Sequence, residues 1–247
     1  MERLGKRTKE TGVRVEIPEA SGQRFISRSG VVLKRGSYME GDLALLLFLK
    51  TSGMTWCYIP GAAKGSVRFG GAMEPLVWGR YQLYQTKRRV YVREVEVTDD
   101  FWQLRKRPKA VFMAARWIRL LAQNLIPGYP YDPLLALFYW AMKALEKGVE
   151  PEIVSARFLW RWLLDWGIAP DFNMCSSCGK PLNGRGAWCD GGFYCEECAS
   201  GQHTITFEHF AGYAQSNSFV PEEENEEITK QARDLFPFFV KNLDDNR

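Results

Sequence analysis

Two pairs of cysteines constrain the fold of this chain more than any other feature of its sequence. Cys175 and Cys178 are followed, after sixteen residues, by Cys195 and Cys198, a C-x2-C-x16-C-x2-C pattern within the zinc-ribbon range. A two-residue gap lets one tight turn direct two thiolates at one ion, and two such turns complete a tetrahedron. Four thiolates leave no position open for water or substrate, so the pattern predicts a structural rather than a catalytic Zn²⁺.

The remaining cysteines and the histidines are not needed as ligands. Cys189 lies between the two pairs, and we expect it to be a free, buried thiol. Cys57 lies in an apolar stretch and is expected in the core. His203 and His209, the two histidines of the chain, follow the second pair and are expected to be solvated or packed in the core.

The first third of the chain has the pattern of a small β-barrel. Runs rich in Val, Leu, Tyr and Trp alternate with Gly, Ser and Lys/Arg turns. Five short strands in about 75 residues favour the five-stranded OB-fold, with an SH3-like barrel as the alternative. The apolar phase slips within the last run, which predicts a bulge. The expected strands span residues 25–35, 43–50, 54–60, 76–84 and 90–97.

From about residue 101 the apolar period becomes helical. The segment 109–126 carries only a narrow polar stripe, so that helix is expected to be mostly buried. Asp132 is expected to cap the next helix, with Pro133 at its first position. Further helices are expected over 152–166 and 222–243, the latter broken into two pieces by Pro237.

The charge distribution follows the same boundary. The whole chain has a net charge of +4, but residues 1–98 hold 17 Lys+Arg and 9 Asp+Glu, whereas residues 99–247 hold 16 and 20. This asymmetry predicts two domains, one of which faces a polyanion. We therefore expect a basic flexible arm (1–23), an OB-fold domain (24–98) that faces the polyanion, and an α-helical domain (99–247) with a zinc-ribbon insertion (175–198).

Basic and aromatic residues alternate on the expected barrel. Residues 80–93 contain five Lys/Arg, three Tyr and no acid. Cations along a phosphate track and rings for base stacking are what single-strand binding needs; a solvated basic hairpin is the alternative. The candidate nucleic-acid-binding residues are Lys34, Arg35, Lys64, Arg68, Arg80, Lys87, Arg88, Arg89 and Arg93.

No catalytic constellation is apparent in the sequence. It has no GxxxxGK[ST] phosphate loop, no GxSxG elbow and no HExxH helix. The spacing of the carboxylates singles out no catalytic pair. We therefore expect a protein that is not an enzyme, and a zinc enzyme is disfavoured because the metal would have no open position.

Several stretches, in order along the chain, carry a family resemblance. They are GVVLKRGSYMEGDLALLLFLKTSGM (30–54), RFGGAMEP (68–75), FLWRWLLDWGIAPDFNMCSSCG (158–179) and GGFYCEEC (191–198). In this set the chain resembles the RecO DNA repair and recombination mediators. The loop at 60–64 (PGAAK) lacks two of that family's usual cations, and we expect Lys6, Arg7, Lys9 and Arg14 of the arm to replace some of them.

The resemblance implies a function and partners. It implies an OB domain followed by a helical domain with a zinc ribbon. It also implies binding of single- and double-stranded DNA, annealing of complementary strands, and work with RecR to load RecA onto strands coated by single-stranded DNA-binding protein (SSB). The acidic SSB tail would suit a cationic groove on the helical domain, with Arg116 and Arg119 as candidates.

Such a protein is expected in the cytoplasm, associated with the nucleoid. The basic N-terminus is not followed by an apolar stretch, so we expect no signal peptide. The alternative function is an OB-fold and zinc-ribbon adaptor that binds RNA or protein without annealing activity.

Overall fold

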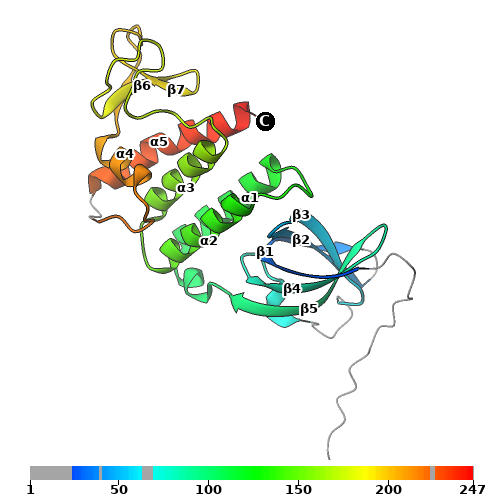
Figure 1. The fold of residues 1–247 in the computed structure, drawn as a ribbon. Helices are drawn as coiled ribbons and strands as arrows, with labels where there is room; N and C mark the ends of the chain where they lie inside the picture. The colour runs from blue at the N-terminus through cyan, green and yellow to red at the C-terminus, as the bar shows by residue number, and fades with distance from the viewer. Residues whose placement is uncertain (1–23, 39–40, 63–68, 223–225, 247) are drawn as a thin grey trace, which may run out of the picture.

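A computed structural model describes residues 24–38, 41–62, 69–222 and 226–246. The arm at 1–23 and the candidate cations Lys64 and Arg68 lie outside these described residues. A β-barrel forms the N-terminal part, helices form the middle layer, and a small sheet carrying the cysteines lies on the far side of the helices (Figure 1). This is the α+β architecture that the sequence predicts.

The N-terminal sheet is a closed barrel with the strand order β1-β2-β3-β5-β4. Antiparallel pairs account for most of it, and a short parallel pairing between β3 and β5 completes it. The predicted OB-type, five-stranded barrel is thereby confirmed. Its strands are β1 (Arg24–Tyr38), β2 (Asp42–Leu49), β3 (Gly53–Ile59), β4 (Trp78–Gln85) and β5 (Val90–Asp99).

The phase slip expected in the fifth strand is a β-bulge. Gln82 of β4 pairs with Glu94 of β5, whereas the next residue, Leu83, pairs with Val92. Arg93 is therefore the extra residue on β5. The bulge bends the strand locally, which helps a short sheet close on itself.

Strand β2 is apolar from Leu43 to Leu49 because both of its faces are buried there. Leu45 and Leu47 belong to the core inside the barrel, whereas Leu46 and Phe48 belong to a second core shared with the helices. Side chains alternate between the two faces of a strand, so a strand buried on both faces has a continuous apolar sequence. The barrel and the helical layer therefore share a core along this strand.

Helix α3 is the centre of the helical layer. Residues 153–160 are all buried, and α3 packs against α1, α2, α4 and α5. The 3₁₀ helix η1 lies in the connection between β3 and β4 of the barrel. The second 3₁₀ helix, η2, links the barrel to α1. The bounds are η1 (Gly70–Met73), η2 (Trp102–Lys106), α1 (Pro108–Asn124), α2 (Asp132–Glu146), α3 (Pro151–Asp165), α4 (Glu208–Gln215) and α5 (Glu226–Asp245).

Three of the helical predictions were wrong. Helix α1 is not mostly buried, because six of its residues are buried and Phe112 is 63% exposed. Pro237 does not divide the last helix, because α5 continues through it. Burial of Leu235, Phe236 and Phe239 on either side of the proline holds the helix together despite the missing N–H. Asp132 does not cap α2; its Oδ1 instead accepts a hydrogen bond of 2.7 Å from the backbone N–H of Thr51 in the β2–β3 turn.

The cysteine segment forms a three-stranded sheet with the order β7-β6-β8. Its strands are β6 (Arg185–Cys189), β7 (Gly192–Tyr194) and β8 (Thr204–Thr206). The sheet packs on α5 through Trp188, whose ring stacks on Phe238 at a centroid distance of 5.1 Å. In the part of the chain that the structure describes, no helix combines the length and the apolar character needed to cross a bilayer.

Candidate metal centre and nucleic-acid interface

Two tight turns present the four cysteines. Cys175 and Cys178 lie in a turn closed by the Gly179 N–H, which donates to the Cys175 carbonyl at 3.0 Å. Gly179 has φ +71° there, a conformation that favours glycine. Cys195 directly follows β7, and its carbonyl accepts from the N–H groups of Cys198 and Ala199 at 3.0 and 2.9 Å.

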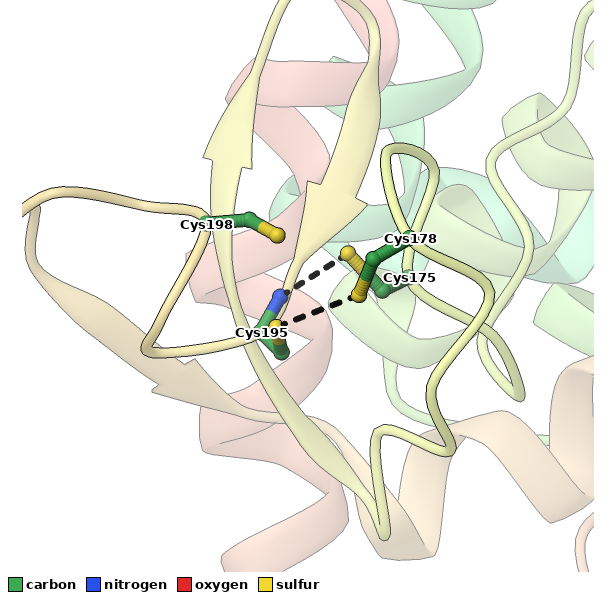
Figure 2. A group of neighbouring side chains, drawn as sticks. All are labelled: Cys175, Cys178, Cys195 and Cys198. Atoms are coloured by element: carbon green, nitrogen blue, oxygen red, sulfur yellow. Dashed lines mark hydrogen bonds between the residues drawn. The ribbon is translucent and has the colours of Figure 1, made fainter.

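The four sulfurs converge on one point (Figure 2). All of them lie within 4.8 Å of one another, and the sulfurs of Cys178 and Cys195 are 3.7 Å apart. In a tetrahedron with metal–sulfur bonds of ~2.3 Å, the sulfurs are about 3.8 Å apart. The spacing and the all-sulfur donor set therefore fit a tetrahedral metal ion.

The backbone prepares one of these thiols for ionisation. The backbone N–H of Cys178, and then that of Cys195 at 3.3 Å from the sulfur, lower the pKa of Cys175 to about 6. Hydrogen bonds with the sulfurs of Cys178 and Cys195 instead raise the pKa of Cys198 to about 12. A cation must therefore displace a proton from the cluster as it binds.

Around the four-cysteine cluster, charged side chains pair with one another. Lys180 forms an ion pair with Glu197, and Arg185 forms one of 3.2 Å with Glu196. The two glutamates occupy the gap between Cys195 and Cys198. Cys189 is a half-buried free thiol whose sulfur accepts a hydrogen bond of 3.8 Å from Gln202.

On the barrel, four of the candidate cations come together around the β4–β5 hairpin. Lys87 and Arg88 are exposed in the turn, which the Thr86 hydroxyl stabilises by accepting from the N–H of Arg89 at 3.0 Å. The guanidinium of Arg89 lies over the ring of Tyr38 at 5.2 Å and over the ring of Tyr58 at 5.4 Å. The guanidinium of Arg93, the bulge residue, lies over the ring of Tyr84 at 5.7 Å.

The rings beneath these arginines form a continuous series, here called the aromatic belt. Successive centroids are 5.1, 6.4, 6.4 and 4.6 Å apart, and Phe25 at one end is 69% exposed. In the order of those distances, the belt comprises Phe25, Tyr84, Tyr91, Tyr58 and Tyr38.

The sequence analysis found only part of this belt. Tyr81 of the 80–93 stretch lies inside the barrel, where its hydroxyl donates to the Val77 carbonyl at 3.2 Å. Phe25, Tyr38 and Tyr58 were missed because they come from β1 and β3, far from the basic hairpin in sequence. Closure of the barrel brings them to the hairpin.

Two of the other candidate cations, Arg35 and Arg80, have acidic neighbours. Arg35 forms an ion pair with Glu74. Arg80 is in register with Glu96 on β5, although no acid occurs within residues 80–93 themselves. Lys34 is exposed near the bulge of β1. The hairpin and the belt therefore form a more strongly cationic surface than the surroundings of Arg35 and Arg80 do.

On the helical layer, Arg116 and Arg119 are exposed on α1, and the guanidinium of Arg116 lies 4.4 Å from the ring centroid of Phe236. A groove of about 600 Å³ lies elsewhere, between α2, α3 and the 217–220 loop, and neither arginine lines it. Its cations are Lys143, Lys147, Arg157 and Arg161. Sequence reasoning missed this groove because its walls come from three separate segments.

A closed OB-type barrel, joined through a shared core to a helical layer with four cysteines that could hold a metal ion, defines a class of two-part barrel proteins. The family model described as "Recombination protein O C terminal" matches residues 105–246, which is more than half of the chain. The chain therefore belongs to the RecO family.

Named relatives agree with this assignment. The chain is 28% identical over 177 residues to the DNA repair protein RecO of Moorella thermoacetica, a match that covers 70% of this chain and 66% of the relative. It is 26% identical over 178 residues to that of Desulforamulus reducens, covering 71% and 69%. For Exiguobacterium sibiricum the identity is 27% over 151 residues, covering 61% of each chain.

Proposed function

We propose that this protein is a DNA-binding recombination mediator and not an enzyme. In this role it anneals complementary single strands and, with RecR, helps load RecA onto SSB-coated single-stranded DNA. The observation that supports this best is the aromatic belt with Arg89 and Arg93 stacked on it, beside the exposed Lys87 and Arg88. The printed names of the relatives, DNA repair proteins, support it as well.

The proposed mechanism uses two properties of the barrel surface. Cations of the hairpin neutralise phosphates and release counterions, so affinity falls steeply with salt. The exposed ring of Phe25 and the half-buried rings of Tyr38, Tyr58 and Tyr91 stack on unpaired bases, whereas Tyr84 is buried beneath Arg93. Such stacking is tolerant of sequence and contributes ~1–3 kcal/mol per base. Two strands held on one cationic surface repel each other less, and their high local concentration favours pairing.

Annealing of complementary oligonucleotides, with and without SSB, tests this proposal. We expect the protein to accelerate annealing, and the double variant Lys87→Ala/Arg88→Ala to do so less. Removal of one cation that binds a phosphate should reduce the slope of log affinity against log salt by about 0.7 for single strands. The matched control is Lys230→Ala/Lys241→Ala, which removes two exposed charges from α5. If the intact protein does not accelerate annealing under either condition, the adaptor function is favoured instead.

We infer that Cys175, Cys178, Cys195 and Cys198 hold a structural Zn²⁺. The support is the all-sulfur donor set and the 3.7 Å sulfur spacing. Because the cysteine sheet packs on α5, removal of the ion should lower the melting temperature. An unchanged melting temperature after complete chelation contradicts a structural role. Cys189→Ser serves as the control and should leave both the zinc content and the melting temperature unchanged.

The domain division and the arm are also part of the proposal. Residues 24–98 would bind DNA, 99–247 would hold zinc and partners, and the 1–23 arm would add phosphate contacts. A truncation that begins near Gly22 tests the arm. If the truncated and full-length proteins bind DNA with equal affinity at moderate salt, the arm does not contribute phosphate contacts.

The SSB tail is proposed to bind the helical domain through Arg116 and Arg119. Both side chains are exposed on α1 and are suited to an acidic peptide. Titration of a labelled SSB-tail peptide should show weaker binding to Arg116→Glu/Arg119→Glu than to Lys147→Glu. If Lys147→Glu weakens binding more, the peptide binds instead in the groove between α2 and α3, which Lys147 lines.

A further inference from the structure

Trp140 is an exposed tryptophan whose position is not explained by packing in the hydrophobic core. It lies on α2 and is 60% exposed, although tryptophan side chains usually bury most of their area. The ring of Tyr139 meets its edge at a centroid distance of 5.4 Å, which supports it from one side. Trp140 lines both the groove between α2 and α3 and a smaller cleft at the junction of the barrel and α2.

The junction cleft has aromatic walls held in fixed positions. Its volume is about 290 Å³, and its rings are Trp78 of β4 with Tyr139 and Trp140 of α2. The Trp78 and Tyr139 rings are 4.9 Å apart. The hydrogen bond from the Thr51 N–H to Asp132 also ties the start of α2 to the barrel beside the cleft. Such a cleft is close to the lower limit of small-ligand sites, ~300 Å³.

The polar groups of the cleft favour a base inside and a phosphate at its rim. Asp132 and Ser29 line it together with Lys50, which is exposed. A carboxylate inside the cleft repels phosphate but accepts hydrogen bonds from base N–H groups, such as the ring N–H of thymine. Lys50 forms no ion pair with any described residue, so its ammonium is available to a phosphate.

The outer face of the β1–β4 pair connects the aromatic belt to this cleft. Along it, Phe25 faces Tyr84, and Ser29 faces Arg80 four pairs further on. Ser29 itself lines the cleft. The rise of a strand is ~3.4 Å per residue, so the path from Phe25 to Ser29 is about 14 Å long. A single strand bound at the belt could therefore continue along this face to Trp140.

We propose that Trp140 is a base-stacking site at the barrel–helix junction, where it receives an unpaired base of a DNA strand that leaves the barrel. This rests on the proposed function and extends the DNA path beyond the barrel. Single-stranded DNA is favoured over a peptide because the cleft suits one ring system and continues the cationic, aromatic barrel face. Lys50 would hold the phosphate next to the stacked base.

The test compares full-length variants binding to labelled oligothymidylate by fluorescence anisotropy. Loss of one stacked base corresponds to about a 5- to 150-fold weaker Kd for Trp140→Ala. Trp140→Phe should retain most of the affinity. Trp102→Ala is the matched control, because Trp102 is 56% exposed but lies on η2 and stacks with Arg105. Each variant must keep the melting temperature of the parent protein.

Two further measurements separate stacking from charge. The salt slope should be unchanged in Trp140→Ala and reduced by about 0.7 in Lys50→Ala. On a strand in which all bases are replaced by abasic residues, Trp140→Ala and the parent should bind equally. Binding of a blunt duplex should also be unaffected by Trp140→Ala.

The outcomes separate this inference from the proposed function. If Lys87→Ala/Arg88→Ala weakens binding but Trp140→Ala does not, the junction site is wrong and the DNA-binding function stands. An equal loss on the abasic strand or on the duplex also overturns the stacking role. If the parent protein binds none of the DNA probes, the proposed function itself fails.

Discussion

Gly53 is the position at which one added methyl group should most disturb the junction between the barrel and the helices. It has φ +61°, and a Cβ there would lie 1.9 Å from the carbonyl oxygen of Tyr129 in the α1–α2 loop. Gly61 is a matched control, because it has φ +69° but no atom of the described residues lies within 4 Å of an added Cβ. Both substitutions by alanine carry the left-handed backbone cost, and only that at Gly53 carries the steric one.

The difference between the two variants can be worked out from the contacts. The left-handed conformation costs ~1–2 kcal/mol for alanine, offset by ~0.4–1 kcal/mol from the stiffer unfolded chain, so Gly61→Ala should lose about 1 kcal/mol. An ordinary contact begins at 3.4 Å, so the loop must move by about 1.5 Å in Gly53→Ala.

That movement disrupts two hydrogen bonds. The Gly128 N–H donates to the Met54 carbonyl at 2.9 Å, and the Thr51 N–H donates to Asp132 at 2.7 Å. A neutral bond contributes ~0.5–1.5 kcal/mol and one to a charged group ~1.5–3 kcal/mol, so Gly53→Ala should lose about 2–4 kcal/mol more than Gly61→Ala.

Urea unfolding of both variants, followed by tryptophan fluorescence and circular dichroism, measures this difference. Equal m-values would show that the same surface unfolds in each protein. A difference below about 0.5 kcal/mol would falsify the view that the hairpin and the α1–α2 loop are rigidly packed, since such a value is within the range of ordinary surface substitutions.

Three further predictions concern the helices and the barrel core. Pro237→Ala restores a helix N–H at an exposed position of α5. It should stabilise the protein by about 1–2 kcal/mol, because the regained helix hydrogen bond and the removed ring clash outweigh the greater flexibility of the unfolded chain. A lower melting temperature of the variant contradicts this. Burial raises the pKa of Cys57 to about 12, whereas an unfolded thiol ionises near ~8.5. Stability should therefore fall by up to ~1.4 kcal/mol per pH unit as pH rises between these values, and Cys57→Val should remove that dependence; equal pH profiles refute it. Lys143 forms an ion pair of 2.9 Å with Asp99 and another with Glu146. In urea unfolding, Lys143→Met should therefore destabilise the protein by about 1–2 kcal/mol, and by less at high salt because salt screens the ion pairs. An unchanged stability at low salt refutes this prediction.

Local patterns predicted much of the fold. The five strands follow from apolar runs between turn residues, and the expected bulge occurs at Arg93. The cysteine cluster follows from spacing alone, because each two-residue gap is closed within a single turn. These features depend on neighbours in sequence, which is why they can be read without the structure.

Features that depend on distant segments could not be predicted in the same way. The belt needs Phe25, Tyr38 and Tyr58 to meet the β4–β5 hairpin, which only barrel closure brings about. The role of Asp132 depends on a turn 81 positions earlier. The continuity of α5 through Pro237 depends on the packing of its neighbours, which outweighs the local helix-breaking tendency.

The double burial of β2 has a consequence for how this protein can evolve and be engineered. A change at Leu46 or Phe48 alters the helical core, and a change at Leu45 or Leu47 alters the barrel core, within one eight-residue strand. A barrel excised alone would expose an apolar stripe and be prone to aggregate. The barrel is therefore not a portable module. Transplanting it would first require polar substitutions along the face of β2 that the helices now cover.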